Sequence, residues 1–305
     1  MDQRRTTLGF VITVYNKAPQ LPWMLASLQN QTDPGIDPQY IFVDDASTDD
    51  SVQVLKAHTK NWPQVQIIEN TNNKGPAVRL NQGIGASSAE YIQFLDADDL
   101  LPEGATQIML RTLKKHHADF IYGQVRRSHR SPEELLKTTI TPTSSQVFDH
   151  PLKGVLTRPC VGMALMARRT TLVQCGGADE SLFVQDQSLP LRLGMAAQRF
   201  VYLPTVTLWA MPSENHLSSN LNQQHHDGFY AFYNALQAIN MHNLKNTTAL
   251  RQIIFQKMVS VLWKAKRGKM ATALPFLPIY LLSKMLPLRP MGLGWLKGQA
   301  DALRP

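Results

Sequence analysis

Residues 90–99 read EYIQFLDADD, an apolar run that ends in three carboxylates within four positions. The run Glu90–Leu95 has the length and composition of a buried strand. Acids this close together repel one another, which disfavours an explanation of Asp96 and Asp98 as simple helix caps, whereas Asp99 fits a cap equally well. Two carboxylates one residue apart can converge on a hard divalent cation, because Mg²⁺ is often held by one or two carboxylates plus substrate phosphates.

The same pattern of a short strand followed by a helix occurs several times before this point. Further β-rich runs occupy Leu8–Val14, Tyr40–Val43, Val65–Glu69 and Asp119–Gln124, and helical patterns lie near 20–30, 49–59, 76–87 and 103–117. Such alternation favours βαβ units. We therefore expect an α/β fold with a mostly parallel, Rossmann-like sheet and flanking helices.

Polar residues follow the strands, and in such sheets ligands bind beyond the carboxyl ends. Asp44 and Asp45 come directly after Tyr40–Val43. Asp45 is suited to accept a hydrogen bond from a base imide or a ribose hydroxyl. The segment Ser47-Thr48-Asp49 is explained equally well as the N-cap of the next helix.

A second candidate anion site is Asn73-Lys74-Gly75-Pro76, which opens a helix with proline near its first position. A cation and free backbone N–H groups at a helix start suit a diphosphate, so Lys74 and Arg79 are candidate ligands. Two alternatives stay open: Gly-Pro is common punctuation before a helix, and Arg79 could be a solvated helix residue.

The second half of the chain is less regular. Residues 125–158 are polar and rich in Ser, Thr and Pro, which predicts an irregular insertion or acceptor-side loop. A strand near 160–167, a Gly176-Gly177 break and helices over 186–197, 222–242 and 247–267 come next. Asp186 by itself is more often an N-cap. His216 falls in a loop and is either a phosphate or metal-side group or a surface residue.

Composition excludes several classes of protein. The chain has 305 residues, 43% of them hydrophobic, which is incompatible with global disorder. Two cysteines exclude a disulfide scaffold and suit a reducing compartment. No stretch reads as a signal peptide or a spanning helix. We expect a cytoplasmic protein.

The net charge of +8 is concentrated in residues 251–305, which hold ten Lys and Arg against the single acid Asp301. Residues 1–250 are therefore close to neutral, which disfavours a nucleic-acid binder. A helix over 251–269, apolar at Ile253, Ile254, Met258 and Leu262, could attach peripherally to an anionic membrane surface on the inner face. The alternative is that it packs on the catalytic domain with its basic face in water.

Taken together, these segments resemble the family 2 glycosyltransferases, which have a GT-A fold. The resemblance covers roughly residues 7–220 and rests on Val11–Lys17, Val43–Asp49, Asn73–Gly75 with Arg79–Gly83, and Phe94–Asp99. It implies a catalytic domain over 1–220, with a nucleotide-sugar half at 1–125 and an acceptor half at 126–220. Residues 221–305 would form a helical, basic C-terminal extension.

The resemblance also implies roles for individual residues. Thr13, Tyr15 and Asp45 would hold the nucleotide base, Asp96 would meet the ribose, and Asp98 would ligate Mn²⁺ or Mg²⁺. In this family an acidic pair after a Gly-Gly-x-Asp-Glu segment supplies the catalytic base. Here Gly176–Glu180 matches that segment, and Asp186 matches the base, while Gln185 departs from the usual Glu-Asp.

The activity that the resemblance implies is that of an inverting, metal-dependent glycosyltransferase. It would move a sugar from a nucleotide sugar, UDP-linked by resemblance, to an acceptor hydroxyl. Peripheral attachment of the basic tail to the membrane would suit a glycan or lipid-linked acceptor in cell-envelope synthesis. Gln185 keeps open the alternative of a degenerate nucleotide-sugar-binding or scaffold protein. A nucleotidyltransferase would carry a Gly-rich loop after the first strand, and Tyr15-Asn16-Lys17-Ala18 is unlike one.

Overall fold

The computed structural model describes residues 5–31, 33–212, 220–242, 247–267, 276–285 and 292–304, and the chain divides into two compact units. The first comprises Met1–Ala178 and Arg192–Glu214, and the second comprises Asp179–Leu191 and Asn215–Pro305. Helix α8, Gln185–Ala196, continues across the division. A domain boundary at residue 220 stays a prediction.

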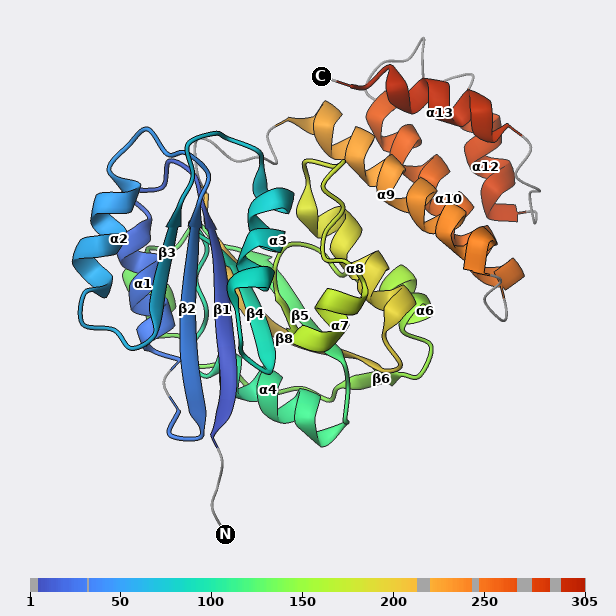
Figure 1. Cartoon of the computed structure of the whole chain (residues 1–305). Coiled ribbons are helices and arrows are strands. Elements are labelled where there is room, and N and C mark those ends of the chain that lie inside the picture. Colours follow the sequence, from blue (N-terminus) through green and yellow to red (C-terminus); the bar gives the residue numbers. More distant parts are fainter. Residues whose placement is uncertain are drawn as a thin grey trace. The chain divides into compact units, whose positions relative to one another are not determined.

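Within the described residues, one eight-stranded sheet forms the centre of the first unit, in the order β3-β2-β1-β4-β7-β5-β8-β6 (Figure 1). Its strands are β1 Thr6–Val14, β2 Ile36–Asp44, β3 Val65–Glu69, β4 Tyr91–Asp96, β5 Phe120–Arg127, β6 Gln146–Phe148, β7 Leu165–Arg168 and β8 Phe200–Ala210.

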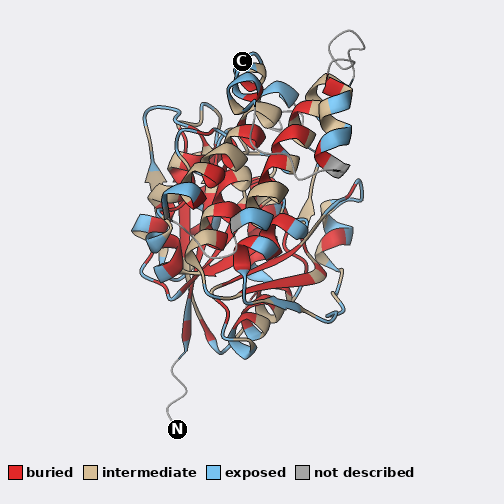
Figure 2. Cartoon of the chain, turned by 90° about the vertical axis from the view of Figure 1, so that its right-hand side faces the viewer, coloured by how far each residue is buried: buried red, intermediate tan, exposed pale blue. Residues whose placement is uncertain are grey.

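The half of the sheet formed by β3, β2, β1 and β4 is entirely parallel. Parallel strands are covered on both faces and therefore read as nearly continuous apolar runs. In β1, Leu8, Val11 and Ile12 are at most 1% exposed. Strands β1, β2 and β4 are buried over most of their length, whereas the edge strand β3 has no buried residue. Figure 2 shows strand segments coloured as buried. The expected α/β fold is confirmed.

The other half of the sheet is mixed. Strand β7 pairs antiparallel with both β4 and β5, β5 pairs parallel with β8, and β6 pairs antiparallel with β8. The predicted strand over 160–167 is correct only for its end. The expectation that 125–158 is irregular is wrong in part, because β5 extends to Arg127 and the segment contains β6 and two helices. Both of those helices begin with a proline. In a stretch rich in Ser, Thr and Pro, the sequence does not distinguish a proline that starts a helix from one in a loop.

Strand β8 is not indicated by the sequence patterns, because Pro204 interrupts its apolar run. Proline has no N–H for the ladder and is tolerated mainly at edges and bulges. The register against β5 shifts just there, from Tyr122↔Tyr202 to Gln124↔Val206. The irregularity accommodates the proline inside the sheet.

The helices of the first unit flank this sheet, and α3 lies against β1 and β2 while α4 lies against β5 and β8. They are α1 Leu21–Gln29, α2 Ser51–Thr59, α3 Pro76–Ala86, α4 Ala105–Lys115, α5 Pro132–Leu136, α6 Pro151–Thr157 and α7 Arg169–Gln174. The first four agree with the sequence-based ranges to within two residues, since each follows a strand and shows a clear helical period.

The second unit is helical over its described part beyond residue 220, with α9 Leu221–His242, α10 Thr247–Lys266, α12 Leu277–Met285 and α13 Leu293–Asp301. The apolar face of α10 is covered within the unit: Ile254, Met258 and Leu262 are each 0% exposed. Helix α10 lies against α9, α12 and α13. These side chains therefore serve as core of the second unit, and packing of this helix on the catalytic domain stays a prediction. Within the described residues, no helix is both long and apolar enough to cross a bilayer.

Candidate functional site

Strands β1, β2 and β4 bring their carboxyl-terminal residues to one edge of the sheet. The register places Thr13 opposite Asp96 and Val14 opposite Asp44. The backbone N–H of Asp45 donates to the carbonyl of Val14 at 2.8 Å. The predicted site residues Thr13, Asp45 and Asp96 therefore share this edge.

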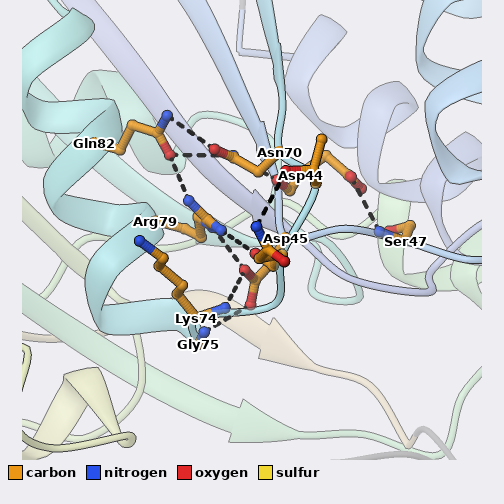
Figure 3. Close-up of polar contacts among 10 residues, drawn as sticks. Asp44, Asp45, Ser47, Asn70, Lys74, Gly75, Arg79 and Gln82 are labelled. Carbon is orange, nitrogen blue, oxygen red and sulfur yellow. Dashed lines mark hydrogen bonds and ion pairs between the residues drawn. The ribbon is translucent and has the colours of Figure 1, made fainter.

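The Asp45 carboxylate organises the loop that leads into α3 (Figure 3). It accepts hydrogen bonds from the backbone N–H groups of Lys74 and Gly75, both at 2.8 Å, and from Nε of Arg79 at 2.6 Å. Asp45 and Arg79 are each 4% exposed. Charge-assisted bonds of this kind are stronger than neutral ones. The carboxylate thus fixes the helix start from the neighbouring strand.

Each sequence-predicted residue of this loop has a distinct part. Gly75 adopts a φ of 85° at the N-cap of α3, a conformation that side-chain-bearing residues rarely take. Lys74 contributes its backbone N–H and leaves its side chain exposed. Arg79 is buried, so the alternative of a solvated helix residue is wrong. Its guanidinium also donates to Gln82 Oε1 at 3.1 Å and to the carbonyl of Asn72.

A second layer of polar contacts supports this loop. Asn70 donates to the backbone carbonyl of Asp44 at 2.7 Å, and the Asn70 and Gln82 amides exchange hydrogen bonds of 3.1 and 3.2 Å. Asp44 Oδ2 accepts from the N–H of Ser47 at 3.0 Å. Its Oδ1 is buried and has no hydrogen-bond partner in the described structure. The edge of the sheet therefore holds two buried carboxylates that differ in their hydrogen bonds. Both oxygens of Asp45 accept hydrogen bonds, whereas only Oδ2 of Asp44 does.

The acid loop after β4 is tied to β1 and the residues that follow it. Thr13 Oγ1 lies 3.4 Å from Asp96 Oδ1, and Lys17 Nζ lies 2.6 Å from Asp98 Oδ2. The side chains of Lys17 and Asp98 are 13% and 9% exposed. A positive charge thus meets the carboxylate that the sequence assigned to a metal.

Asp99 is the most deeply buried acid of the loop. Burial raises its pKa well above the ordinary value, and the charges of Asp96 and Asp98 raise it further, against the N–H of Met211, which donates to Asp99 Oδ1 at 3.3 Å. Its N–H donates to the carbonyl of Asp96 at 3.1 Å. Asp99 therefore closes the acid turn and joins it to the end of β8, a role different from the helix cap considered above.

The acid loop fits a divalent cation by its donor chemistry. Asp96 and Asp98 offer hard carboxylate oxygens of the kind that Mg²⁺ and Mn²⁺ prefer. Among the residues described, no group of three or more His, Cys, Asp and Glu side chains is placed to hold a metal. A cation held by these two carboxylates, with substrate phosphates as its further ligands, is consistent with this donor set and with the absence of a third protein ligand among the described residues. The other predicted ligand, His216, lies outside the described residues.

The loop after β1 is joined to the loop after β2. The N–H of Asn16 donates to Ser47 Oγ at 3.0 Å, and that of Ala18 donates to Asp49 Oδ2 at 3.0 Å. Asn16 and Ala46 adopt positive φ values of 52° and 62°, which non-glycine residues seldom do and which concentrate at functional sites. Tyr15 is left 44% exposed, so its ring is available to a ligand.

Asp49 does more than the N-cap interpretation of its segment requires. Its Oδ1 accepts from the N–H and the hydroxyl of Ser51 at 3.0 and 2.5 Å. Burial raises its pKa, but the hydrogen bonds from Ser51 and Ala18 outweigh burial, and the pKa is lowered overall. One carboxylate therefore both supports the start of α2 and connects it to the loop after β1.

The Gly176-Gly177 break is a tight turn attached to α3. Gly177 has a φ of 66°, and a Cβ there would fall 2.1 Å from Asn81 Oδ1. Asn81 makes two hydrogen bonds with Ala178, one with its N–H at 2.8 Å and one with its carbonyl at 3.0 Å. Arg192 Nε donates to the carbonyl of Gly177 at 2.7 Å. The turn is thus held from two helices.

Asp186 lies in the first turn of α8 and, among the described site residues, is the one that belongs to the second unit. Its N-terminal position agrees with both interpretations of its sequence, because acids are favoured at helix N-termini. The residue before the helix, Val184, donates its N–H to Asp227 Oδ2 on α9 at 2.8 Å.

The sequence analysis missed three residues that contact the predicted site segments, namely Lys17, Asn81 and Asp227. Lys17 stood within the quoted segment after β1, so its place beside the acids could have been suspected. Asn81 stood within the α3 segment but gave no sign of its partner. Asp227 had no signal, because it is 43 residues from Val184 and follows two histidines that look like surface residues.

Comparisons of the chain with known proteins show its family. The family model described as "Glycosyl transferase family 2" matches residues 10–171. A relative from Bacillus spizizenii named poly(ribitol-phosphate) beta-glucosyltransferase is 34% identical over 135 residues, which is 43% of this chain and 21% of that protein. The chain therefore spans about a fifth of this relative's length.

Solved structures resemble the fold over nearly the whole chain. Residues 1–349 of TarS from S. aureus, in complex with UDP-GlcNAc, align with a TM-score of 0.65 at 16% identity, over 98% of this chain and 84% of that one. A mannosyltransferase from Pyrobaculum calidifontis, in complex with GDP-Man and Mn²⁺, aligns with a TM-score of 0.61 at 17% identity, over 98% and 86%. At these identities the likeness concerns the fold.

Proposed function

The chain belongs to glycosyl transferase family 2, and from that premise we propose that it transfers a sugar from a UDP-sugar to an acceptor hydroxyl with inversion at the anomeric carbon. One observation carries the proposal: Thr13, the Asp45–Arg79 pair and the Asp96–Asp98 loop are joined at the carboxyl edge of parallel strands. Ligands of α/β sheets bind at such an edge.

The donor-side roles rest on these contacts. Thr13 and the exposed ring of Tyr15 would contact the nucleotide base. Asp45 would hold the loop at Lys74 and Gly75 next to that base. Asp96 would meet the ribose. Asp98 would hold Mn²⁺ or Mg²⁺, which supplies positive charge against the departing diphosphate. The complex of the Pyrobaculum mannosyltransferase with Mn²⁺ supports the choice of metal.

We assign the proton transfer to Asp186. Its carboxylate takes the proton of the acceptor O–H, the oxygen forms a bond to the anomeric carbon, and the bond from that carbon to the phosphate oxygen breaks. The leaving UDP keeps the electron pair. General base catalysis of this type supplies about 10²–10⁴-fold.

The acceptor we propose is a hydroxyl of a cell-envelope polymer or lipid-linked glycan. The names of the relatives support this class, since they include poly(ribitol-phosphate) transferases and a minor teichoic acid biosynthesis protein. Such polymers are polyanionic, and the surplus of Lys and Arg in residues 251–305 suits polyanions of either kind, polymer or membrane lipid.

Peripheral attachment to the inner face of the cell membrane is the localisation we propose. Since the apolar face of α10 is buried, attachment would use the exposed apolar side chains of α12 and α13. Leu281, Leu282 and Trp295 are 49%, 44% and 44% exposed. Apolar groups beside a basic segment are the combination that holds proteins at anionic interfaces.

The test is thermal unfolding of the full chain with UDP, GDP, UDP-GlcNAc or UDP-glucose, in Mn²⁺ or EDTA, followed by UDP release in the presence of poly(ribitol phosphate). We expect a Mn²⁺-dependent stabilisation by one nucleotide class, because a ligand at 100 times its Kd stabilises by about 2.7 kcal/mol. Asp98→Ala should abolish the metal dependence. Absence of stabilisation by every nucleotide would refute the donor site.

A second candidate is a nucleotide-sugar-binding protein without transfer activity, which the glutamine at Gln185 favours because it replaces one acid of the usual pair. The variant Asp186→Asn separates the two. For an enzyme, this variant binds the donor normally and loses UDP release. For a binding protein, the unmodified chain already releases no UDP with any acceptor.

A further inference from the structure

Asp227 is a buried carboxylate on α9 that has no part in the roles assigned so far. It is 1% exposed. Its Oδ2 accepts the backbone N–H of Val184 at 2.8 Å, and its Oδ1 accepts from Gln223 Nε2 at 2.7 Å and faces His226 Nδ1 at 2.8 Å. The His226 ring in turn lies 4.8 Å from the ring of Tyr230.

A carboxylate is rarely buried this completely, because desolvation of its charge is costly unless hydrogen bonds compensate. Here two of the compensating groups come from α9 itself, at Gln223 and His226. The third comes from a distant segment of the chain. An apolar side chain would fill this space at less cost, so the polar network indicates a constraint on the distant segment.

That segment is the residue immediately before α8. Val184 precedes the helix, and Asp186 lies in its first turn. The first N–H groups of a helix lack partners within the helix, and in this case the partner is supplied by another helix rather than by a local side chain. Fixing the Val184 N–H therefore fixes where α8 begins and in which direction Asp186 leaves the backbone.

The other end of the same segment is attached to α9 as well. Asn234 Nδ2 donates to Asp179 Oδ2 at 2.8 Å, and the N–H of Asp179 donates to Ser188 Oγ at 3.0 Å. Residues 179–188 are thus held by α9 at two points, Asp227 and Asn234. All of these residues belong to the second unit.

We propose that Asp227 is a positioning residue for Asp186, holding the start of α8 so that the Asp186 carboxylate meets the acceptor hydroxyl. The inference rests on the proposed function, in which Asp186 accepts the proton. Since a displacement of about 1 Å can cost about 10²-fold in rate, the contact at Val184 would act on turnover rather than on donor binding.

The experiment uses the full chain and UDP release from UDP-GlcNAc with Mn²⁺, first with water and then with poly(ribitol phosphate) as acceptor. We expect Asp227→Ala to lower kcat by about 10²-fold while the KM for UDP-GlcNAc and the Kd for UDP stay within about twofold. Asp227→Asn keeps an oxygen that can accept from Val184, so it should recover much of the loss. Met258→Ala, a core truncation on α10 in the same unit, is the matched control for stability and should keep its kcat.

The outcomes separate this inference from the function on which it rests. If Asp186→Asn retains activity, the assignment of the base is wrong, whatever Asp227 does. If Asp186→Asn is inactive and Asp227→Ala turns over like the unmodified protein, the positioning role alone is refuted. Equal losses of kcat in Asp227→Ala and Met258→Ala would show a stability effect and would also refute it.

Discussion

Lys17 Nζ lies 2.6 Å from Asp98 Oδ2, and the ion pair joins residues 81 positions apart in the sequence. Both side chains are largely shielded from solvent, so the pair is less screened than one at the surface. The carboxylate proposed to hold a metal is therefore already neutralised by a fixed positive charge. A cation that binds Asp98 must compete with Lys17 or share the carboxylate with it.

This relationship leads to the first prediction. Lys17→Ala should strengthen binding of Mn²⁺ in the absence of nucleotide by on the order of tenfold, because it removes the repulsion between the ammonium and the bound cation. Two unit charges this close interact by roughly 1 kcal/mol in water and roughly 4 kcal/mol at a partly buried site. Calorimetric titration with MnCl₂ measures the change. Lys56→Ala, which removes an exposed partner of Glu69, is the control and should leave Mn²⁺ binding unaltered. Weaker binding in Lys17→Ala would contradict the competition.

The second prediction concerns the buried pair of Arg79 and Asp45. Arg79→Met should destabilise the fold by about 3–5 kcal/mol, since it leaves the Asp45 carboxylate buried without its cation. Urea unfolding followed by circular dichroism measures the loss. Arg111→Met removes an exposed ion pair with Asp33 and should cost less than about 1 kcal/mol. Equal effects of the two variants would show that the Asp45 network contributes little.

A third prediction tests the turn at Gly177. Gly177→Ala should destabilise by roughly 1–3 kcal/mol, because alanine is strained at positive φ and its Cβ meets Asn81 Oδ1. In the double variant Gly177→Ala/Asn81→Ala the clash is absent, so the two losses should sum to more than the measured total.

The control for this substitution is Gly85→Ala in α3, where an added Cβ meets nothing within 4 Å. Alanine is the better helix former, so this variant should stabilise by about 0.5–1 kcal/mol. Thermal unfolding of these variants beside the unmodified protein gives the comparison. Strict additivity of Gly177→Ala and Asn81→Ala would argue against the contact between them.

The fourth prediction is a pH dependence from His225 on α9. Burial lowers its pKa below the ordinary 6.5, Lys264 and Arg267 lower it further, and a backbone hydrogen bond with Leu221 opposes them. The unfolded chain therefore binds this proton more readily than the folded protein. The free energy of unfolding is at its full value above pH 6.5, the ordinary pKa, and decreases as the pH falls from there through the lower pKa of the folded protein. His225→Gln should reduce the fall in Tm between about pH 7 and 5. Parallel Tm curves for the two proteins would contradict the prediction.

A fifth prediction tests the membrane proposal. Leu281→Asp/Leu282→Asp should lower co-sedimentation with vesicles containing phosphatidylglycerol, because it places charges on an apolar, exposed part of α12. Val173→Asp, which alters an exposed apolar residue on α7 in the other unit, is the control and should bind like the unmodified protein. If the chain fails to sediment with these vesicles at low salt, the attachment is refuted before any variant is compared.

Several features of the fold could be predicted because their cause is local. The apolar runs at β1, β2, β3 and β4, each followed by polar residues, determine parallel strands whose ends meet at one edge. Proline at the start of α3 and the period of α9 and α10 likewise act within a few residues. Strand β8 could not be predicted from its own sequence, since Pro204 is acceptable only because a bulge against β5 accommodates it.

By itself, the sequence determined which residues reach the edge of the sheet. Thr13, Asp45, Asp96 and Asp98 lie at or just after the ends of apolar runs, and such runs are a property of neighbouring residues. Only the tertiary structure decided how they are partnered. The contacts of Lys17 with Asp98, of Arg79 with Asp45 and of Asp227 with Val184 span 81, 34 and 43 residues. Such pairs form because strand register and helix packing bring distant segments together, and a buried charge then takes the partner that the fold supplies.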